Sequence, residues 1–313
     1  APQAKTTTLS FDEPGNFGGL NFGTGFNSLG PNSVSSLTFD TDTATPGTTV
    51  TAILTFKIAD HWHMYWRNPG APYGLPPTFS FNLPAGFSID ESAIRWPVPT
   101  KKTYPSVMEE GEIDTVFEYD GEIGFLIPVT VASDTTKGPH TLSIDLSWVE
   151  CETDSTCISQ DQSLSAQLTV GDQSKSSPAA QLSRWESGVP NNNKTTATAW
   201  WNGDLSTNQR ALVIEWESTD PATDFYPHET TGDWEATAGT EKLSAPAGKT
   251  RIQTIVTLNE GDWPTTIAGL LIEGSGTNIS ATKVIVRVGE TPTSASLALA
   301  PAVTDHPLLY WLS

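Results

Sequence analysis

Two cysteines, Cys151 and Cys157, are the residues of this 313-residue chain whose type and spacing point most directly to chemistry. They lie six positions apart, so on two strands joined by a short turn their sulfurs can come within disulfide reach. Such a bridge closes a small loop and stabilises a fold by about 2.4 kcal/mol, less than a long-range bridge does. Three interpretations follow from these residues: a structural staple, a redox-active pair and a metal site.

The residues around the pair are acidic, because Glu150, Glu152 and Asp154 flank it. Like charge raises the pKa of a thiol and disfavours the reactive thiolate. This setting is poor for a free-standing nucleophile. It suits a pair that exchanges only when a partner completes the site.

A second group of candidate residues is His61, His63 and Met64, since imidazole and thioether groups suit copper. In a strand, however, the two histidines share one face and Met64 points to the other. The alternative interpretation is an aromatic strand that ends in an Asn-Pro-Gly turn at residues 68–70, with its tryptophans in the core.

The chain contains 11 tryptophans, which could serve as stacking platforms for a carbohydrate. Those of the second half are the candidates: Trp200, Trp201, Trp216, Trp234 and Trp263. Most tryptophans of β-sandwiches pack in the core or at its rim, which is the competing interpretation. The adjacent acids Glu109 and Glu110 do not have the spacing of glycosidase carboxylates.

The elements that must position these residues are predicted to be strands. Short runs alternate apolar and polar residues between turns, and no segment keeps a period of about 3.6 residues over three turns. In the first half we expect strands at residues 36–41, 48–58, 79–83, 124–131, 141–148 and 163–170. In the second half we expect them at residues 211–216, 250–257, 266–273 and 282–288. The predicted fold is all-β, with two Ig-like antiparallel β-sandwich domains in tandem.

Changes in composition along the chain predict its domain boundaries. We expect an extended N-terminal arm at residues 1–33, an Ig-like domain with both cysteines at 34–174, a linker at 175–195 with a short helix near 179–186, a second β-sandwich at 196–290, and a tail at 291–313. The tail ends in an apolar run, and we expect it to lead to a removed membrane segment.

The formal net charge is −20, with 36 acidic against 16 basic residues. This balance argues against nucleic acid and against anionic membrane surfaces as partners. No apolar run approaches the roughly 18 residues that a membrane helix needs. Few lysines and many Thr, Ser, Asn and Gly residues suit an exported protein.

Several motifs, in order and spacing, resemble the periplasmic N-terminal region of the DsbD/ScsB family of membrane thiol:disulfide interchange proteins. The motifs are HWHMYWRNPG at residues 61–70, GLPP at 74–77, LPAGF at 83–87, IRWPVP at 94–99, YDGE at 119–122, LIPV at 126–129, and DLSWVEC at 145–151 with the second cysteine at 157. The resemblance covers roughly residues 45–170. Ile158, Ser159 and Gln160 follow the second cysteine in place of Tyr-Pro-Pro, which favours the ScsB-like branch.

The resemblance implies an enzyme of thiol:disulfide interchange that needs no cofactor and no metal. It implies a periplasmic location, with the full-length protein anchored to the inner membrane. A transmembrane redox domain of the same full-length protein would reduce the cysteine pair, which would then reduce periplasmic thioredoxin-fold proteins. The competing hypothesis is a non-enzymatic copper- or carbohydrate-binding β-sandwich module.

The resemblance also implies roles for individual residues. Cys157 is the sulfur expected in the mixed disulfide, and Cys151 is the resolving one. A cap loop is expected to cover the pair from within residues 108–119, with Phe117 and Tyr119 as its shielding aromatics.

Overall fold

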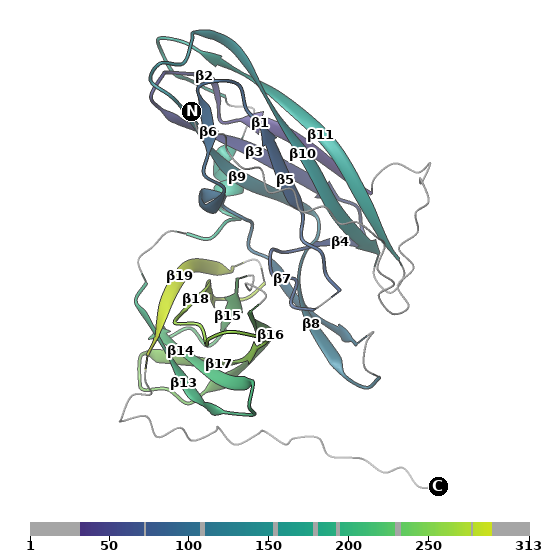
Figure 1. Cartoon of the computed structure of the whole chain (residues 1–313), viewed down its shortest axis with the longest axis vertical. Helices are drawn as coiled ribbons and strands as arrows, with labels where there is room; N and C mark the ends of the chain where they lie inside the picture. Colours follow the sequence, from purple (N-terminus) through teal and green to yellow (C-terminus); the bar gives the residue numbers. More distant parts are fainter. Residues whose placement is uncertain are drawn as a thin grey trace.

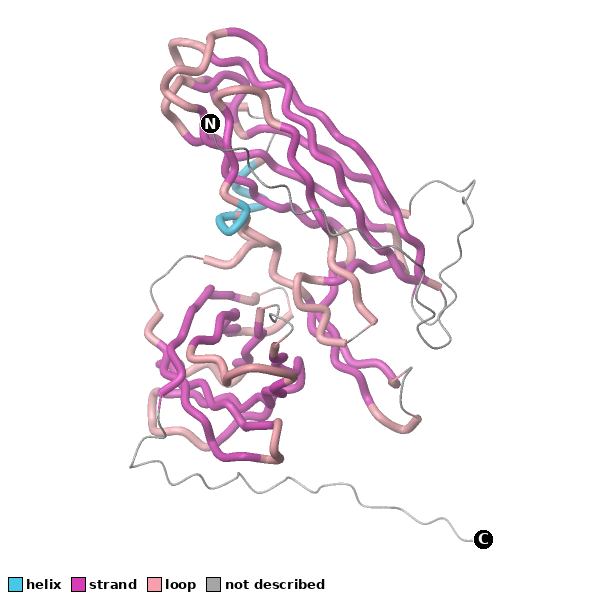
Figure 2. The backbone as a smooth tube through the Cα atoms, in the orientation of Figure 1, coloured by secondary structure: helices cyan, strands magenta, loops and turns pink. Residues whose placement is uncertain are grey.

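The computed structural model describes residues 32–71, 73–106, 110–152, 156–177, 181–191, 195–228, 233–276 and 278–289. These residues form 19 strands, one 3₁₀ turn, η1 (Glu91–Ala93), and one short helix, α1 (Leu182–Glu186), so the predicted all-β class is confirmed (Figures 1 and 2). No helix in the described ranges is long and apolar enough to cross a membrane. The expected tail, and the expected arm before Asn32, lie outside the described residues.

The first domain consists of two sheets. One sheet has the order β1 (Ser33–Phe39), β3 (Thr49–Ile58), β9 (Glu122–Val131) and β6 (Phe87–Ile89). The other has the order β12 (Lys175–Ser176), β2 (Thr41–Ala44), β11 (Cys157–Val170), β10 (Gly138–Glu152), β4 (Trp62–Tyr65), β8 (Ile113–Tyr119) and β7 (Thr100–Pro105), with β5 (Thr78–Asn82) also paired to β10.

The core of this domain lies between the two sheets. Strands such as β3 alternate buried and more exposed residues, which gives each sheet an apolar inner face. Phe56 of β3 meets Trp148 of β10 edge-on, with ring centroids 5.4 Å apart. This contact joins the two sheets, so the predicted sandwich is confirmed for the first domain.

Strands β10 and β11 form a long antiparallel hairpin that extends past the rest of the sandwich (Figure 1). Their register runs without a shift from Gly138 opposite Val170 to Cys151 opposite Cys157. The predicted strands at 141–148 and 163–170 cover only part of this hairpin. The distal end of the hairpin is more polar than a typical strand, with Ser and Gln residues along β11. The alternation of apolar and polar residues therefore did not predict this part of the two strands.

The predicted linker contains ordered elements that pack on the first domain. Strand β12 pairs with β2, and helix α1 lies in the segment where a helix was expected. Trp185 of α1 covers Gly124 of β9, where an added Cβ would lie 2.6 Å from the indole ring. Glycine at this position therefore permits the close approach of the helix to the sheet.

The second domain is a single path of seven strands around its own core. Their order is β15 (Thr223–Pro227), β18 (Thr266–Glu273), β19 (Ser280–Gly289), β13 (Ala197–Asp204), β14 (Gln209–Glu217), β17 (Lys249–Leu258) and β16 (Trp234–Leu243). The parallel pairing of β13 with β19 joins its two antiparallel parts. The Ig-like topology stays a prediction for both domains.

The two domains share a continuous apolar core. Residues of the second domain belong to the first domain's cluster of buried side chains: Tyr226, Ala238, Leu270, Ile272 and Ala281. The ring of Tyr226 lies 4.6 Å from that of Phe117 on β8. Beside it, the ammonium group of Lys101 lies 2.8 Å from a carboxylate oxygen of Asp224.

Candidate functional site

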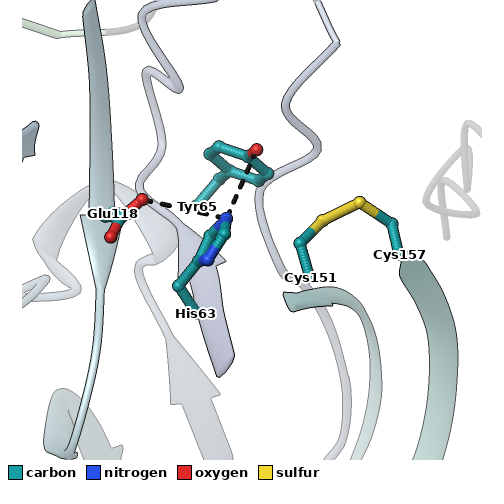
Figure 3. The surroundings of a disulfide bond; sticks show 5 residues. All are labelled: His63, Tyr65, Glu118, Cys151 and Cys157. Atoms are coloured by element: carbon teal, nitrogen blue, oxygen red, sulfur yellow. Dashed lines mark hydrogen bonds and ion pairs between the residues drawn. A yellow bond between two sulfur atoms is a disulfide. The ribbon is translucent and has the colours of Figure 1, made fainter. Parts of the chain in front are cut away.

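A disulfide joins Cys151, near the end of β10, to Cys157, the first residue of β11 (Figure 3). The two residues are direct cross-strand partners, with their Cα atoms 4.0 Å apart. Just beyond them, the backbone N–H of Glu152 donates to the carbonyl of Thr156 at 2.8 Å. The bridge therefore links neighbouring strands at the distal end of a hairpin.

The two sulfur-bearing residues differ in exposure. Cys151 is buried, with 4% of its surface exposed, whereas Cys157 is only partly buried. A thiol of a second protein therefore meets less steric obstruction at Cys157. The resemblance assigns the mixed disulfide to Cys157, and this role stays a prediction.

Strand pairing places three residues side by side across three strands. Cys157 lies opposite Cys151, and Cys151 lies opposite His63 of β4. Directly opposite residues of an antiparallel pair point to the same face, with Cβ atoms about 4.5–5.5 Å apart. On the same strand Tyr65 follows two residues later, opposite Glu118 of β8. All five side chains therefore lie on one face of the sheet, which we call the disulfide face.

An apolar cluster surrounds the disulfide on this face. Its buried members besides Cys151 are Tyr65, Ala71, Val116 and Val149, and its partly buried members besides Cys157 are Tyr73 and Tyr104. Burial first, and then the nearby acid Asp114, raise the pKa of Tyr73 to about 12, so its hydroxyl stays protonated. Apolar surroundings of this kind also disfavour a thiolate.

Phe117 and Tyr119, the expected shielding aromatics, lie on the opposite face of the sheet. Successive side chains of a strand alternate, so Val116 and Glu118 occupy the disulfide face of β8 instead. Phe117 packs in the core against Trp66, with ring centroids 5.4 Å apart. The aromatic residues that the structure brings to the disulfide are Tyr65, Tyr73 and Tyr104.

A fully buried carboxylate, that of Glu118, lies on the disulfide face. The hydroxyl of Tyr104 donates to it at 3.1 Å, and the ammonium group of Lys102 lies 2.7 Å away. Burial disfavours the charge of Lys102, but Glu118 and Asp120 outweigh that effect and raise its pKa above the ordinary value. The cation and the carboxylate thus stabilise one another beside the disulfide.

His63 lies between this carboxylate and Cys151 (Figure 3). Its Nε2 atom is 3.8 Å from Glu118 Oε2 and 3.5 Å from the hydroxyl oxygen of Tyr65. Burial lowers the pKa of His63 below 6.5, and the opposing influence of Glu118 is smaller. The imidazole is therefore neutral at neutral pH.

The acidic neighbours expected beside the cysteines are arranged differently from the prediction. Glu150 points to the face opposite Cys151, where its carboxylate is fully buried. It accepts hydrogen bonds from Asn32, Ser33 and Gln160. Glu150 therefore ties the start of β1 to β10 instead of facing the sulfurs, and Asp154 lies outside the described residues.

The groups considered for copper do not converge. Met64 is buried in the main core, on the face opposite His63, and His61 is exposed in the preceding turn with a positive φ of 70°. Within the described ranges no three His, Cys, Asp or Glu residues are grouped as a metal site would require.

The tryptophans considered for carbohydrate are mainly packing residues. Trp200 and Trp216 are each 2% exposed. Trp201 and Trp263 are only partly buried, but they meet edge-on, with Arg210 over the ring of Trp263 at 4.3 Å. This arrangement differs from a flat, open stacking platform.

Sequence reasoning missed Glu118, Lys102 and Tyr104 and considered His63 only as a metal ligand. One signal was present in the sequence. His63 and Tyr65 are two positions apart, and so are Val116 and Glu118, as expected for one face of a strand. What the pattern lacks is the pairing of these strands, which alone brings the residues together.

Comparison with known proteins gives one family match. Residues 34–169 match the family described as "Thiol:disulfide interchange protein DsbD, N-terminal". The matched range includes both cysteines and the whole of the disulfide face. Together with the disulfide, it supports a thiol:disulfide interchange domain in this part of the chain.

Other comparisons add little. No curated protein matches the sequence. A protein of unknown function from Porphyromonas gingivalis W83 is 12% identical, with a TM-score of 0.23 over 82% of this chain and 100% of that one. A conserved domain protein from Bacillus anthracis is 8% identical, with a TM-score of 0.21 over 82% of this chain and 86% of that one. At such scores neither likeness bears on the fold.

Proposed function

We propose that residues 34–174 act in the periplasm as a thiol:disulfide exchange domain whose Cys151 and Cys157 cycle between a disulfide and two thiols. The domain relays electrons from a transmembrane redox domain of the same full-length protein to periplasmic thioredoxin-fold proteins. The family match over residues 34–169 supports the reaction class. The ScsB-like branch, the location and the partners are parts of this proposal.

The observation that carries the proposal is the unequal exposure of two bonded cysteines at a hairpin end. In the reduced domain, the Cys157 thiolate attacks a partner's disulfide. A Cys157–partner bond forms, and one partner sulfur leaves as a thiolate. Cys151 then attacks the Cys157 sulfur, which restores the internal disulfide and releases the second partner sulfur. Two electrons pass to the partner, and no cofactor takes part.

Trapping of the mixed disulfide tests this scheme. Reduced Cys151→Ala retains the attacking sulfur and lacks the resolving one, so it should form a stable covalent complex with an oxidised thioredoxin-fold protein. Cys157→Ala should form none. Non-reducing electrophoresis and mass spectrometry identify the linked residue. The reverse pattern would exchange the two roles, and no complex with either variant would contradict the proposal.

The reduction potential of the pair separates an exchange site from a structural staple. Structural disulfides of exported proteins typically have potentials below about −300 mV. We expect a higher value for this pair, measured by equilibration with glutathione or dithiothreitol buffers. A value well below that limit would indicate a staple.

A further inference from the structure

His63 has no part in the exchange scheme above, although it is the direct cross-strand partner of Cys151 on β4. We propose that His63 is the proton acceptor for the Cys151 thiol when this thiol resolves the mixed disulfide, and the proton donor for the Cys151 thiolate in the reverse reaction. The inference rests on the proposed thiol:disulfide exchange, and it assigns a catalytic residue to that site.

The first argument is position. His63 and Cys151 are paired residues of neighbouring strands and point to the same face. Figure 3 shows the imidazole ring on the side of Cys151 that faces away from Cys157. A proton on the Cys151 sulfur can thus pass to the ring while the opposite side of the sulfur is directed toward Cys157.

The second argument is the unused ring nitrogen. Nε2 lies beside Tyr65 and Glu118, whereas the buried Nδ1 has no hydrogen-bond partner among the residues that the structure describes. His63 is only 6% exposed, so water does not readily satisfy this atom. A proton on Nε2 directed toward the Glu118 carboxylate leaves Nδ1 with a lone pair, which is the form of imidazole that accepts a proton.

The third argument is that Cys151 needs a base. In the disulfide, Cys151 is 4% exposed and belongs to the same apolar cluster as Val116, Val149 and Tyr65, so bulk water should have little access to the proton of its thiol in the reduced form. Burial in apolar surroundings also raises the cost of a free thiolate. A neighbouring base removes this cost, because the proton leaves as the new sulfur–sulfur bond forms.

Glu118 and its partners act as positioning groups. The carboxylate fixes the ring through Nε2 and stabilises the imidazolium that forms, and Tyr104 stacks on the ring with centroids 6.3 Å apart. Burial lowers the pKa of the ring more than Glu118 raises it, and the nearby Lys102 adds to the lowering, so the resting imidazole is unprotonated. The ring is thus held as a neutral base with a counter-ion in place for its charged form.

The proposed step is balanced. Cys151 transfers its proton to His63 and its sulfur attacks the Cys157 sulfur of the mixed disulfide. The Cys151–Cys157 bond forms, the bond from Cys157 to the partner breaks, and the partner sulfur leaves with the electron pair. His63 then loses its proton to the departing thiolate or to solvent. No further oxidant or reductant is consumed.

The test uses the reduced protein and excess dithiobis(nitrobenzoate), which releases coloured thionitrobenzoate twice. The first release reports attack by Cys157 and depends on reagent concentration. The second reports resolution by Cys151 and does not. We expect His63→Gln to slow the second release at pH 7 by at least about tenfold, since general bases typically contribute 10²–10⁴-fold. The first release should change less than about twofold.

His140→Gln is the matched control, because it makes the same substitution at the other end of β10. It should leave both releases unchanged. If His63→Gln leaves the second release unchanged, or slows both releases equally, His63 is not the base. If the wild-type protein shows no second release, the proposed exchange itself fails, which is a distinguishable result.

A measurement on the wild-type protein covers the case in which His63→Gln does not fold. The rate of the second release should follow the titration of the His63 ring, observed by NMR. The groups that face this ring are Cys151 of β10, Tyr65 of β4, Glu118 of β8 with the following Asp120, and Lys102 and Tyr104 of β7. A rate that rises about tenfold per pH unit through and above that titration would indicate solvent hydroxide as the base and overturn the proposal.

Discussion

The ring of Phe117 on β8 lies 4.6 Å from the ring of Tyr226 on β15, so one strand serves both domains. The next residue, Glu118, points to the other face of β8 and lies beside the disulfide. The hairpin of β7 and β8 runs along the second domain (Figure 1). Packing at the domain interface therefore fixes the strand that positions Glu118 and Val116.

Replacement of Phe117 by alanine should destabilise the protein by about 3–5 kcal/mol, because it removes a fully buried ring from the interface. Chemical denaturation measures the change. We also expect the second release of thionitrobenzoate to be no faster than in the wild-type protein, because a loosened β8 positions Glu118 less well. Tyr226→Phe is the control, as it keeps the facing ring. An equal loss of stability in Phe117→Ala and Tyr226→Phe would contradict the conclusion that the Phe117 ring stabilises the interface.

Gly70 provides a second test of the interface. It has a φ of +81°, and an added Cβ would lie 2.6 Å from the Thr115 carbonyl and 2.8 Å from the Ala238 Cβ across the interface. Gly248 has a similar φ of +79° but no atom of the described residues within 4 Å. Both alanine variants carry about 1–2 kcal/mol of backbone strain. Gly70→Ala should lose about 1–3 kcal/mol more, and equal losses would show that the interface yields to the added methyl group.

Some of this fold follows from local pattern. The alternation of β3 predicts its buried face, including Phe56, and the short spacing of Cys151 and Cys157 predicts a local pairing on adjacent strands. Both features involve residues close in sequence. The strands and turns that carry these features are specified by the period of the side chains and by the turn residues alone.

The contents of the disulfide face could not be derived in this way. Phe117 and Glu118 are neighbours in sequence, and only the register of β8 with β4 decides which of them reaches the disulfide. A slip of one residue would exchange them. The register is set by contacts distant in sequence, such as that of Phe117 with Tyr226 in the second domain.

Glu150 should be among the polar residues most important for stability. Its carboxylate is fully buried and accepts hydrogen bonds from Asn32, Ser33 and Gln160. Glu150→Ala leaves these donors unsatisfied and should cost about 3–5 kcal/mol of unfolding free energy. Glu235→Ala, in an exposed position of β16, should change it by less than about 0.5 kcal/mol. A small effect at Glu150 would mean that water replaces the carboxylate.

Loss of the disulfide should have a modest effect on stability. The bridge closes a short loop between adjacent strands, and the large core of the first domain does not depend on it. Cys151→Ala combined with Cys157→Ala should lower the free energy of unfolding by about 2 kcal/mol. Urea denaturation of this variant and of the oxidised protein gives the difference. A variant that fails to fold would favour a structural staple.

Acid should destabilise the domain interface through His228. Burial first, and then the nearby cations Arg67 and Lys283, lower the pKa of His228 to about 3. The unfolded chain binds a proton near pH 6.5 and the folded protein does not, so stability is complete above pH 6.5 and falls as the pH drops toward 3. The loss is at most about 1.4 kcal/mol per pH unit.

His63 contributes in the same direction, since burial also lowers its pKa. The free energy of unfolding is measured for the wild-type protein, His228→Gln and His63→Gln at about pH 7.5, 6.5, 5.5 and 4.5. The comparison separates the contributions of the two histidines to the pH dependence of stability. Each variant should flatten the decline below pH 6.5, and His228→Gln should flatten it more because the pKa of His228 is displaced to about 3. An unchanged decline in His228→Gln would mean that His228 is protonated inside the folded interface, so that burial and the cations Arg67 and Lys283 do not hold it neutral.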